Sequence, residues 1–144
     1  MALNYFEING EAIKTLLSIK KQVSTIEEAL QYLVELRVSQ INGCAYCVNL
    51  HSIEARKAGV PQQKLDCLTV WKESDFFSER ECAALSWAES VTRIYEERQP
   101  EEKLDLLLET FSEKEAVDLT FIVSTMNALN RIAISCGDKP EKVA

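Results

Sequence analysis

The fold of this chain is decided by residues 35–51, which read E-L-R-V-S-Q-I-N-G-C-A-Y-C-V-N-L-H. The dipeptide Asn42-Gly43 is typical of a helix break, so we expect one helix to end near Ile41 and the next to begin near Cys44. The run 44–58 contains neither glycine nor proline and stops at a glycine, which is a normal signal for a helix end. The stretch therefore predicts two consecutive helices joined by a tight turn.

Side chains with redox and acid–base chemistry begin the second of these helices. Cys44, Cys47 and His51, the only histidine in the chain, are spaced i, i+3, i+7 and share one helix face. Both thiols lie in the first turn, where unpaired backbone N–H groups favour a thiolate over a thiol. An adjacent imidazole can accept a thiol proton or stabilise the anion. The spacing predicts a reactive dithiol, with Glu35 as the carboxylate just upstream.

The rest of the chain also has apolar residues at helical spacing. The expected helices cover Glu7 to Val23, Ile26 to Ile41, Cys44 to Ala58, Pro61 to Trp71, Glu79 to Tyr95, Glu101 to Glu109 and Glu113 to Cys136. Capping boxes are expected with Thr25, Ser78 and Ser112 as N-cap residues, because each is followed three positions later by a glutamate. No convincing strand pattern is found. We predict an all-α bundle of about five to seven helices, in a single domain over residues 1–144.

Composition and charge restrict the class of function. With 47% hydrophobic and 27% charged residues, the chain has the composition of a soluble globular protein. Its net charge of −7 argues against binding to nucleic acid or to an anionic membrane surface. The first ten residues lack a signal-peptide pattern, and no uncharged stretch approaches the roughly 18 residues needed to span a bilayer. Five cysteines in helical patterns are unlike a secreted disulfide framework, so we expect a cytoplasmic protein.

The residues alone leave several interpretations of the cysteine pair open. A helical cysteine is most often a small buried hydrophobe. Cys44 and Cys47, one turn apart, can instead close a redox disulfide. Together with His51 they offer three zinc ligands, whereas a structural zinc site needs four. The fourth ligand would have to be Glu35, reaching across from another helix. We therefore expect no metal. Without the motif, Glu35 is most simply a solvated helix residue in an ion pair.

The motif R-V-S-Q-I-N-G-C-A-Y-C-V-N-L-H, followed by the helix end A-R-K-A-G, resembles the alkylhydroperoxidase AhpD-like core of the carboxymuconolactone decarboxylase-like superfamily. The match is strongest from about Glu35 to Gly59 and continues more loosely to about Tyr95. This resemblance implies an all-helical AhpD-like bundle and a homo-oligomer, commonly a trimer or hexamer. It also implies a thiol-dependent peroxidase that reduces hydrogen peroxide or organic hydroperoxides without a cofactor, and that is re-reduced by a dithiol carrier, lipoylated in the characterised systems.

The same resemblance implies a role for each site residue. Cys47 would attack the peroxide, Cys44 would resolve the sulfenic acid to a disulfide, and His51 would be the base for Cys47. The relay glutamate of characterised members corresponds to Tyr32 here, and Glu35, on roughly the same helix face, is expected to replace it. Three alternatives remain: a dithiol–disulfide reductase or redox sensor without peroxide turnover, a non-redox oligomeric module with a vestigial site, and a carboxymuconolactone decarboxylase-like enzyme, which does not depend on this cysteine pair.

Overall fold

The computed structural model describes residues 1–98 and 100–143. Within them the chain forms eight α-helices, two 3-10 helices and no strand, which confirms the predicted all-α class. The elements in chain order are α1 (Tyr5–Ile8), α2 (Gly10–Ser18), η1 (Ile19–Lys21), α3 (Glu28–Asn42), α4 (Ala45–Lys57), α5 (Gln62–Asp66), η2 (Leu68–Glu73), α6 (Glu79–Thr92), α7 (Pro100–Leu108) and α8 (Glu113–Cys136).

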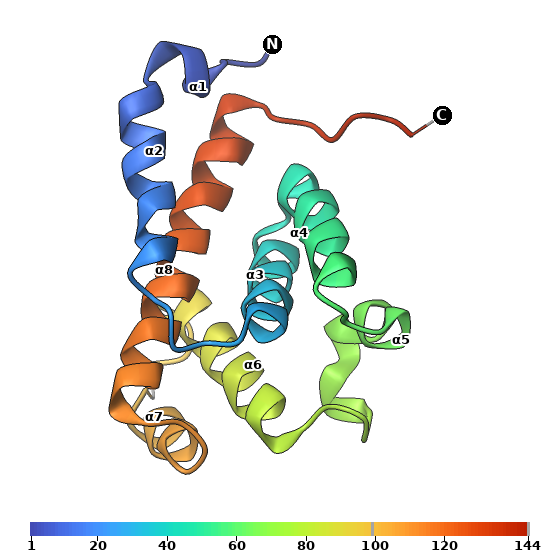
Figure 1. Cartoon of the computed structure of the whole chain (residues 1–144), viewed down its shortest axis with the longest axis vertical. Coiled ribbons are helices and arrows are strands. Elements are labelled where there is room, and N and C mark those ends of the chain that lie inside the picture. The colour runs from blue at the N-terminus through green and yellow to red at the C-terminus, as the bar shows by residue number, and fades with distance from the viewer. Residues whose placement is uncertain (99, 144) are drawn as a thin grey trace.

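Helix α3 is the centre of the bundle and packs against α4, α6 and α8 (Figure 1). Every residue from 33 to 39 is buried. A helix buried on all sides, instead of along a single stripe, is typical of the middle of a core. One apolar cluster joins α3 to α6, α7 and α8, and a second joins it to α4, α5 and η2. Any charged residue in the middle of α3 is therefore held inside the protein.

Two of the three predicted capping boxes are present. Ser78 begins α6 and Ser112 begins α8, and each serine side chain accepts the backbone N–H of the glutamate three residues on. The box predicted at Thr25 was wrong, because α3 begins at Glu28 without a side-chain cap. The Thr25 hydroxyl instead donates to the buried carboxylate of Asp118 in α8, 2.7 Å away. A buried carboxylate requires such donors, and this tertiary contact replaces the local cap.

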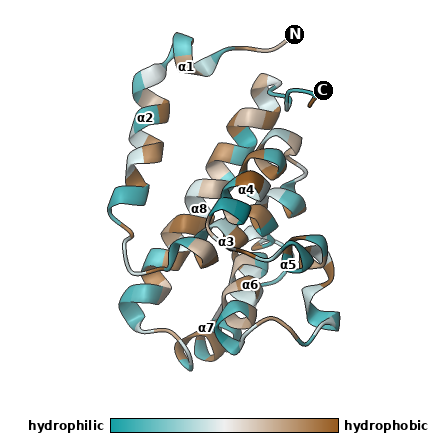
Figure 2. Ribbon diagram, turned by 45° about the vertical axis from the view of Figure 1, so that its right-hand side comes forward, coloured by the Kyte–Doolittle hydropathy of each residue, from teal (hydrophilic) through white to brown (hydrophobic). Residues whose placement is uncertain are grey.

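The N-terminal segment differs most from the prediction. One helix was expected from Glu7 to Val23, whereas the structure divides this segment into α1, α2 and η1. The break lies at Asn9, whose side chain accepts the N–H of Ala12 and so caps a new helix. Only Ile13 of α2 is buried, and α2 stands apart from the bundle in Figure 2. We call residues 1–21 the N-terminal arm.

The start of this arm is fastened to the end of α8. The N–H of Leu3 donates to the carbonyl of Cys136 at 2.8 Å, and the Tyr5 hydroxyl donates to the Asp138 carboxylate. Gly137 lies between Cys136 and Asp138 in the sequence and has a left-handed φ of 85°. A Cβ at this position would lie 2.9 Å from the carbonyl oxygen of Met1. A glycine is thus needed for this close approach, which keeps both termini at one end of the bundle (Figure 1).

Further boundaries also differ from the prediction and make the number of helices larger than expected. The predicted helix from Pro61 to Trp71 is divided into α5 and η2, and α6 ends at Thr92, before the exposed Tyr95.

Helix α8 is, by length and composition alone, long and apolar enough to cross a membrane. It buries Asp118 and Asn130 among its packed residues and lies against α3 and α6, as the core helix of a globular protein does.

Candidate active site: a disulfide, a histidine and two carboxylates

The predicted helix break between α3 and α4 is present. Gly43 has a left-handed φ of 72°, a conformation that favours glycine at a helix end. The side-chain amide of Asn42 donates to the amide oxygens of Asn127 and Asn130, at 2.9 and 3.0 Å. These bonds fix the turn against α8, and Cys44 follows directly as the N-cap residue of α4.

The two cysteines of the motif are joined. Cys44 and Cys47 form a disulfide with an S–S distance of 2.07 Å. The backbone N–H of Cys47 points at the sulfur of Cys44, 3.2 Å away, so the Cys44 side chain caps the helix. Both residues are buried, with exposed fractions of 1% and 4%. The first turn of α4 thus brings the sulfurs within bonding distance, as the spacing requires for a redox pair.

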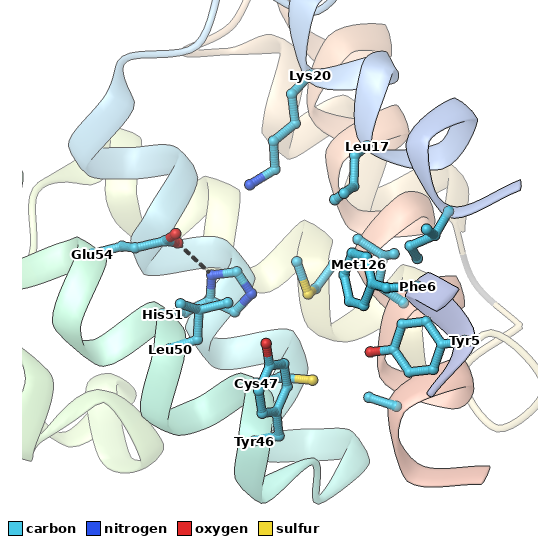
Figure 3. Close-up of a pocket in the computed structure, with 13 residues that line it drawn as sticks. Tyr5, Phe6, Leu17, Lys20, Tyr46, Cys47, Leu50, His51, Glu54 and Met126 are labelled. Atoms are coloured by element: carbon cyan, nitrogen blue, oxygen red, sulfur yellow. Dashed lines mark hydrogen bonds and ion pairs between the residues drawn. The ribbon is translucent and has the colours of Figure 1, made fainter. Parts of the chain in front are cut away.

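His51 lies one turn beyond Cys47 and is held between two carboxylates. Its Nδ1 is 3.1 Å from Oε2 of Glu35 in α3 and 2.9 Å from Oε2 of Glu54 in α4. The other ring nitrogen points into the space that Cys47 also faces (Figure 3). A ring fixed through one nitrogen presents the other in a set orientation, which is the arrangement of a general base.

Glu35 is completely enclosed and has partners from three elements. Its side chain is 1% exposed. Lys20 of η1 places its Nζ 3.0 Å from Oε1 and 3.2 Å from Oε2, and Gln31 donates to Oε1 at 3.1 Å. With His51 on Oε2, both carboxylate oxygens are satisfied, as a buried charge requires. The N-terminal arm therefore reaches the centre of the site through one ammonium group.

The pKa values of this pair move in opposite directions. Burial disfavours the imidazolium, but hydrogen bonds to Glu35 and Glu54 and the charges of both carboxylates outweigh it and raise the pKa of His51. Burial also disfavours the carboxylate of Glu35, but the hydrogen bond from His51 and the charge of Lys20 outweigh it and lower the pKa of Glu35. The surroundings therefore favour the ionised pair.

A pocket of about 190 Å³ lies in front of Cys47 and His51 (Figure 3). It is enclosed by α4, α8 and the N-terminal arm. Most of its wall is apolar, formed by Phe6, Ile13, Leu17, Leu50, Met126, Leu129 and Ala133. Cys47 lines this pocket and Cys44 does not. Only one of the two sulfurs is therefore presented to a small molecule that enters.

The carboxylates around His51 are also possible metal ligands. Glu35, His51 and Glu54 place three possible ligand atoms within 4.8 Å of one another. The Lys20 ammonium, however, lies within 3.2 Å of both oxygens of Glu35, and Nδ1 of His51 already contacts both carboxylates. A cation bound here would face that ammonium at close range. The donor set fits an ion-pair cluster better than a metal ion.

Comparison with known proteins assigns the chain to a family. The pattern of the carboxymuconolactone decarboxylase family matches residues 11–90, which contain the disulfide, His51, Glu35 and Glu54. This chain belongs to the carboxymuconolactone decarboxylase family. The uncharacterised protein YdfG of Bacillus subtilis is 38% identical over 139 residues, or 95% of each chain.

Two solved structures share the fold of this chain. A protein of unknown function from Agrobacterium tumefaciens, for which a role as the antioxidant defence protein AhpD has been suggested, is 35% identical and superposes with a TM-score of 0.91 over 98% of this chain and 99% of its own. The debrominase Bmp8 is 24% identical, with a TM-score of 0.82 over 94% of this chain and 74% of its own. These likenesses confirm the AhpD-like fold. Since enzymes of this fold catalyse different reactions, the fold by itself assigns none of them.

The structure brings together the four predicted site residues. Cys44 and Cys47 are bonded, and Glu35 contacts His51 from the neighbouring helix. Their catalytic roles stay predictions. Tyr32, which was the alternative to Glu35 as the relay partner, lies instead with its ring centroid 5.6 Å from the Lys20 ammonium.

Sequence analysis missed two members of the site, Glu54 and Lys20. Glu54 could have been found, because it is three residues after His51 on the same helix and so lies beside it. Lys20 gave no local signal. It comes from a segment outside the motif, and its contact with Glu35 depends on how the N-terminal arm folds back.

Proposed function

We propose that this protein is a thiol peroxidase that reduces organic hydroperoxides through the dithiol of Cys44 and Cys47. The observation that carries the proposal is the shared pocket: Cys47 and the free nitrogen of His51 face the same small, mostly apolar space. A nucleophile beside an oriented base, in a site that excludes bulk water, is the arrangement that thiol chemistry requires.

The reaction begins from the reduced dithiol. His51 accepts the thiol proton of Cys47, and the thiolate attacks the terminal oxygen of R–O–O–H. The S–O bond forms as the O–O bond breaks, and the leaving alkoxide takes the proton back from His51 to give the alcohol. Cys47 is left as a sulfenic acid. Glu35 and Glu54 hold the ring through Nδ1 and stabilise the imidazolium during this step.

The second step forms the disulfide. The thiolate of Cys44 attacks the sulfur of Cys47, the S–O bond breaks, and hydroxide leaves with a proton as water. Because the two sulfurs occupy one helical turn, the bond forms without moving the backbone far. An external dithiol supplies the two electrons that restore both thiols. A reducing cytoplasm would maintain such a carrier, and we propose a lipoylated protein in this role.

The pocket favours an organic hydroperoxide over hydrogen peroxide. Its volume of about 190 Å³ is more than hydrogen peroxide needs. The apolar wall from α8 and the N-terminal arm would cover a hydrocarbon group while the peroxide bond meets Cys47. Burial of apolar surface contributes about 25 cal/mol per Å² to binding, and hydrogen peroxide has no such surface. We expect this selectivity to appear in KM.

We also propose that the protein forms a homo-oligomer. Four apolar side chains of α7 and α8 are more than a third exposed and form one surface, consisting of Leu104, Leu108, Val117 and Phe121. An apolar face of this kind on a small domain is typical of a subunit contact. The family resemblance favours a trimer or a hexamer.

A direct assay tests the proposed activity. The reduced protein is given cumene hydroperoxide or hydrogen peroxide with dihydrolipoamide as the electron donor, and peroxide loss is measured. We expect turnover with both and a lower KM for cumene hydroperoxide. Cys47→Ser should abolish turnover, whereas Cys67→Ser, at a free cysteine outside the site, should leave it unchanged. Disulfide formation without turnover would identify a redox sensor instead.

A further inference from the structure

Two carboxylates contact the same ring nitrogen of His51. Its Nδ1 lies 2.9 and 3.1 Å from two carboxylates, of Glu54 and Glu35, and the ring is buried. Two such neighbours hold a proton on an imidazole and keep it cationic. A base must release that proton so that it can accept the next one from a thiol. A positive group that draws charge from one of these carboxylates would weaken its hold on the proton.

Lys20 is placed to do this. Its ammonium lies 3.2 Å from Oε2 of Glu35, the same oxygen that is 3.1 Å from Nδ1 of His51. One carboxylate oxygen is thus shared by two positive groups. Among the described residues that line the pocket, Lys20 is the only lysine or arginine. Its side chain is 33% exposed, whereas that of Glu35 is 1% exposed, so a partly solvated ammonium contacts an enclosed carboxylate.

We propose that Lys20 is a positioning residue that shares the charge of Glu35 with His51, fixes this carboxylate against the ring, and leaves His51 able to give up its proton. The inference rests on the proposed function insofar as His51 acts as a base. It assigns a chemical purpose to the fold of the N-terminal arm, because the 3-10 helix η1 at its end carries the ammonium into the site.

The other groups that face His51 do not perform this task. Glu35 faces it from α3 and Glu54 from its own helix, and both are acidic. Tyr5 of α1 and Tyr46 of α4 line the same pocket. Burial, with the hydrogen bond to Asp138, raises the pKa of Tyr5, so its phenol stays neutral. Cys47 is in the disulfide and does not titrate in this state.

The single histidine of the chain makes a direct test possible. The pKa of His51 is measured by NMR titration of its imidazole signals in the oxidised protein, where neither site cysteine contributes a proton. Lys20→Met keeps a long apolar side chain and removes the charge. We expect it to raise the pKa of His51 by about 0.5–1, the size of effect expected for one partly exposed charge that contacts the shared carboxylate. Lys20→Arg should restore a value near that of the parent protein.

The matched control is Lys21→Met, at the neighbouring exposed lysine of η1, which should leave the titration unchanged. A pKa of His51 in Lys20→Met that equals or falls below the parent value overturns the proposal, because Lys20 would then not draw charge away from the ring. The titration needs no turnover, so it tests the effect of Lys20 on the pKa of His51 even if the protein is not a peroxidase. If it is one, the acidic limb of kcat/KM should move to higher pH in Lys20→Met by the same amount.

Discussion

Cys47, and not Cys44, should be the thiol that attacks the peroxide. The test replaces each cysteine by serine in turn and follows a single oxidation event. Two effects of the structure oppose each other here. Cys44 is at the N-cap of α4 and its sulfur receives the N–H of Cys47 at 3.2 Å, which favours a thiolate on Cys44. Cys47 has the imidazole of His51 one turn away in the same pocket.

The magnitudes decide in favour of Cys47. The partial charge of a helix N-terminus is worth ~0.3–1 kcal/mol, and up to ~2 kcal/mol in a partly buried site, which lowers a thiol pKa by at most about 1.5. A histidine partner can lower a thiol pKa from about 8.5 to about 3–4. Burial does not distinguish the two residues, since the exposed fractions of Cys44 and Cys47 are 1% and 4%. Access points the same way, because only Cys47 lines the pocket.

The assay mixes reduced protein with substoichiometric cumene hydroperoxide, quenches it, and locates the oxidised sulfur by mass spectrometry. Cys44→Ser should accumulate a sulfenic acid on Cys47 at nearly the parent rate, but should not turn over. Cys47→Ser should be oxidised at least about 100-fold more slowly, as is usual when an activated nucleophile is lost. A fast-forming sulfenic acid on Cys44 would refute the reasoning and reverse the two roles.

Three further outcomes are expected. Glu35→Gln should slow peroxide reduction by about 10- to 100-fold while the mass from light scattering stays unchanged; unaltered turnover would return Glu35 to an ordinary ion-pair role. The raised pKa of His51 means that its stabilising contribution is complete below pH 6.5 and is lost as pH rises through the folded-state value. Urea denaturation should thus show a larger loss of stability for His51→Gln at pH 6 than at pH 9, and an equal loss at both would contradict this. Phe121→Glu, on the exposed face of α8, should lower the mass of the oligomer, and a monomeric parent protein would remove the basis for that prediction.

Local signals in the sequence were sufficient for the part of the fold that carries the dithiol. The Asn42-Gly43 turn and the capping boxes at Ser78 and Ser112 each act within a few residues, and all three were predicted where the structure has them. The box at Thr25 has the same sequence pattern but was wrong. Its hydroxyl lies close to the buried Asp118, 93 positions away in the sequence, and a buried carboxylate competes more strongly for a donor than a helix end in water does. Such competition cannot be read from a local pattern.

The site shows the same division between local and distant information. The spacing of Cys44, Cys47 and His51 fixes which of them share a helix face, because these three belong to one helix. The protonation state of His51 does not follow from that spacing. It depends on Glu54 and on Glu35 from the preceding helix, and Glu35 in turn contacts Lys20 of η1 only when the N-terminal arm returns to the bundle. A motif search that finds the dithiol and the histidine therefore identifies the proposed reacting groups, whereas the carboxylate of Glu35 and the ammonium of Lys20 join them only in the folded chain.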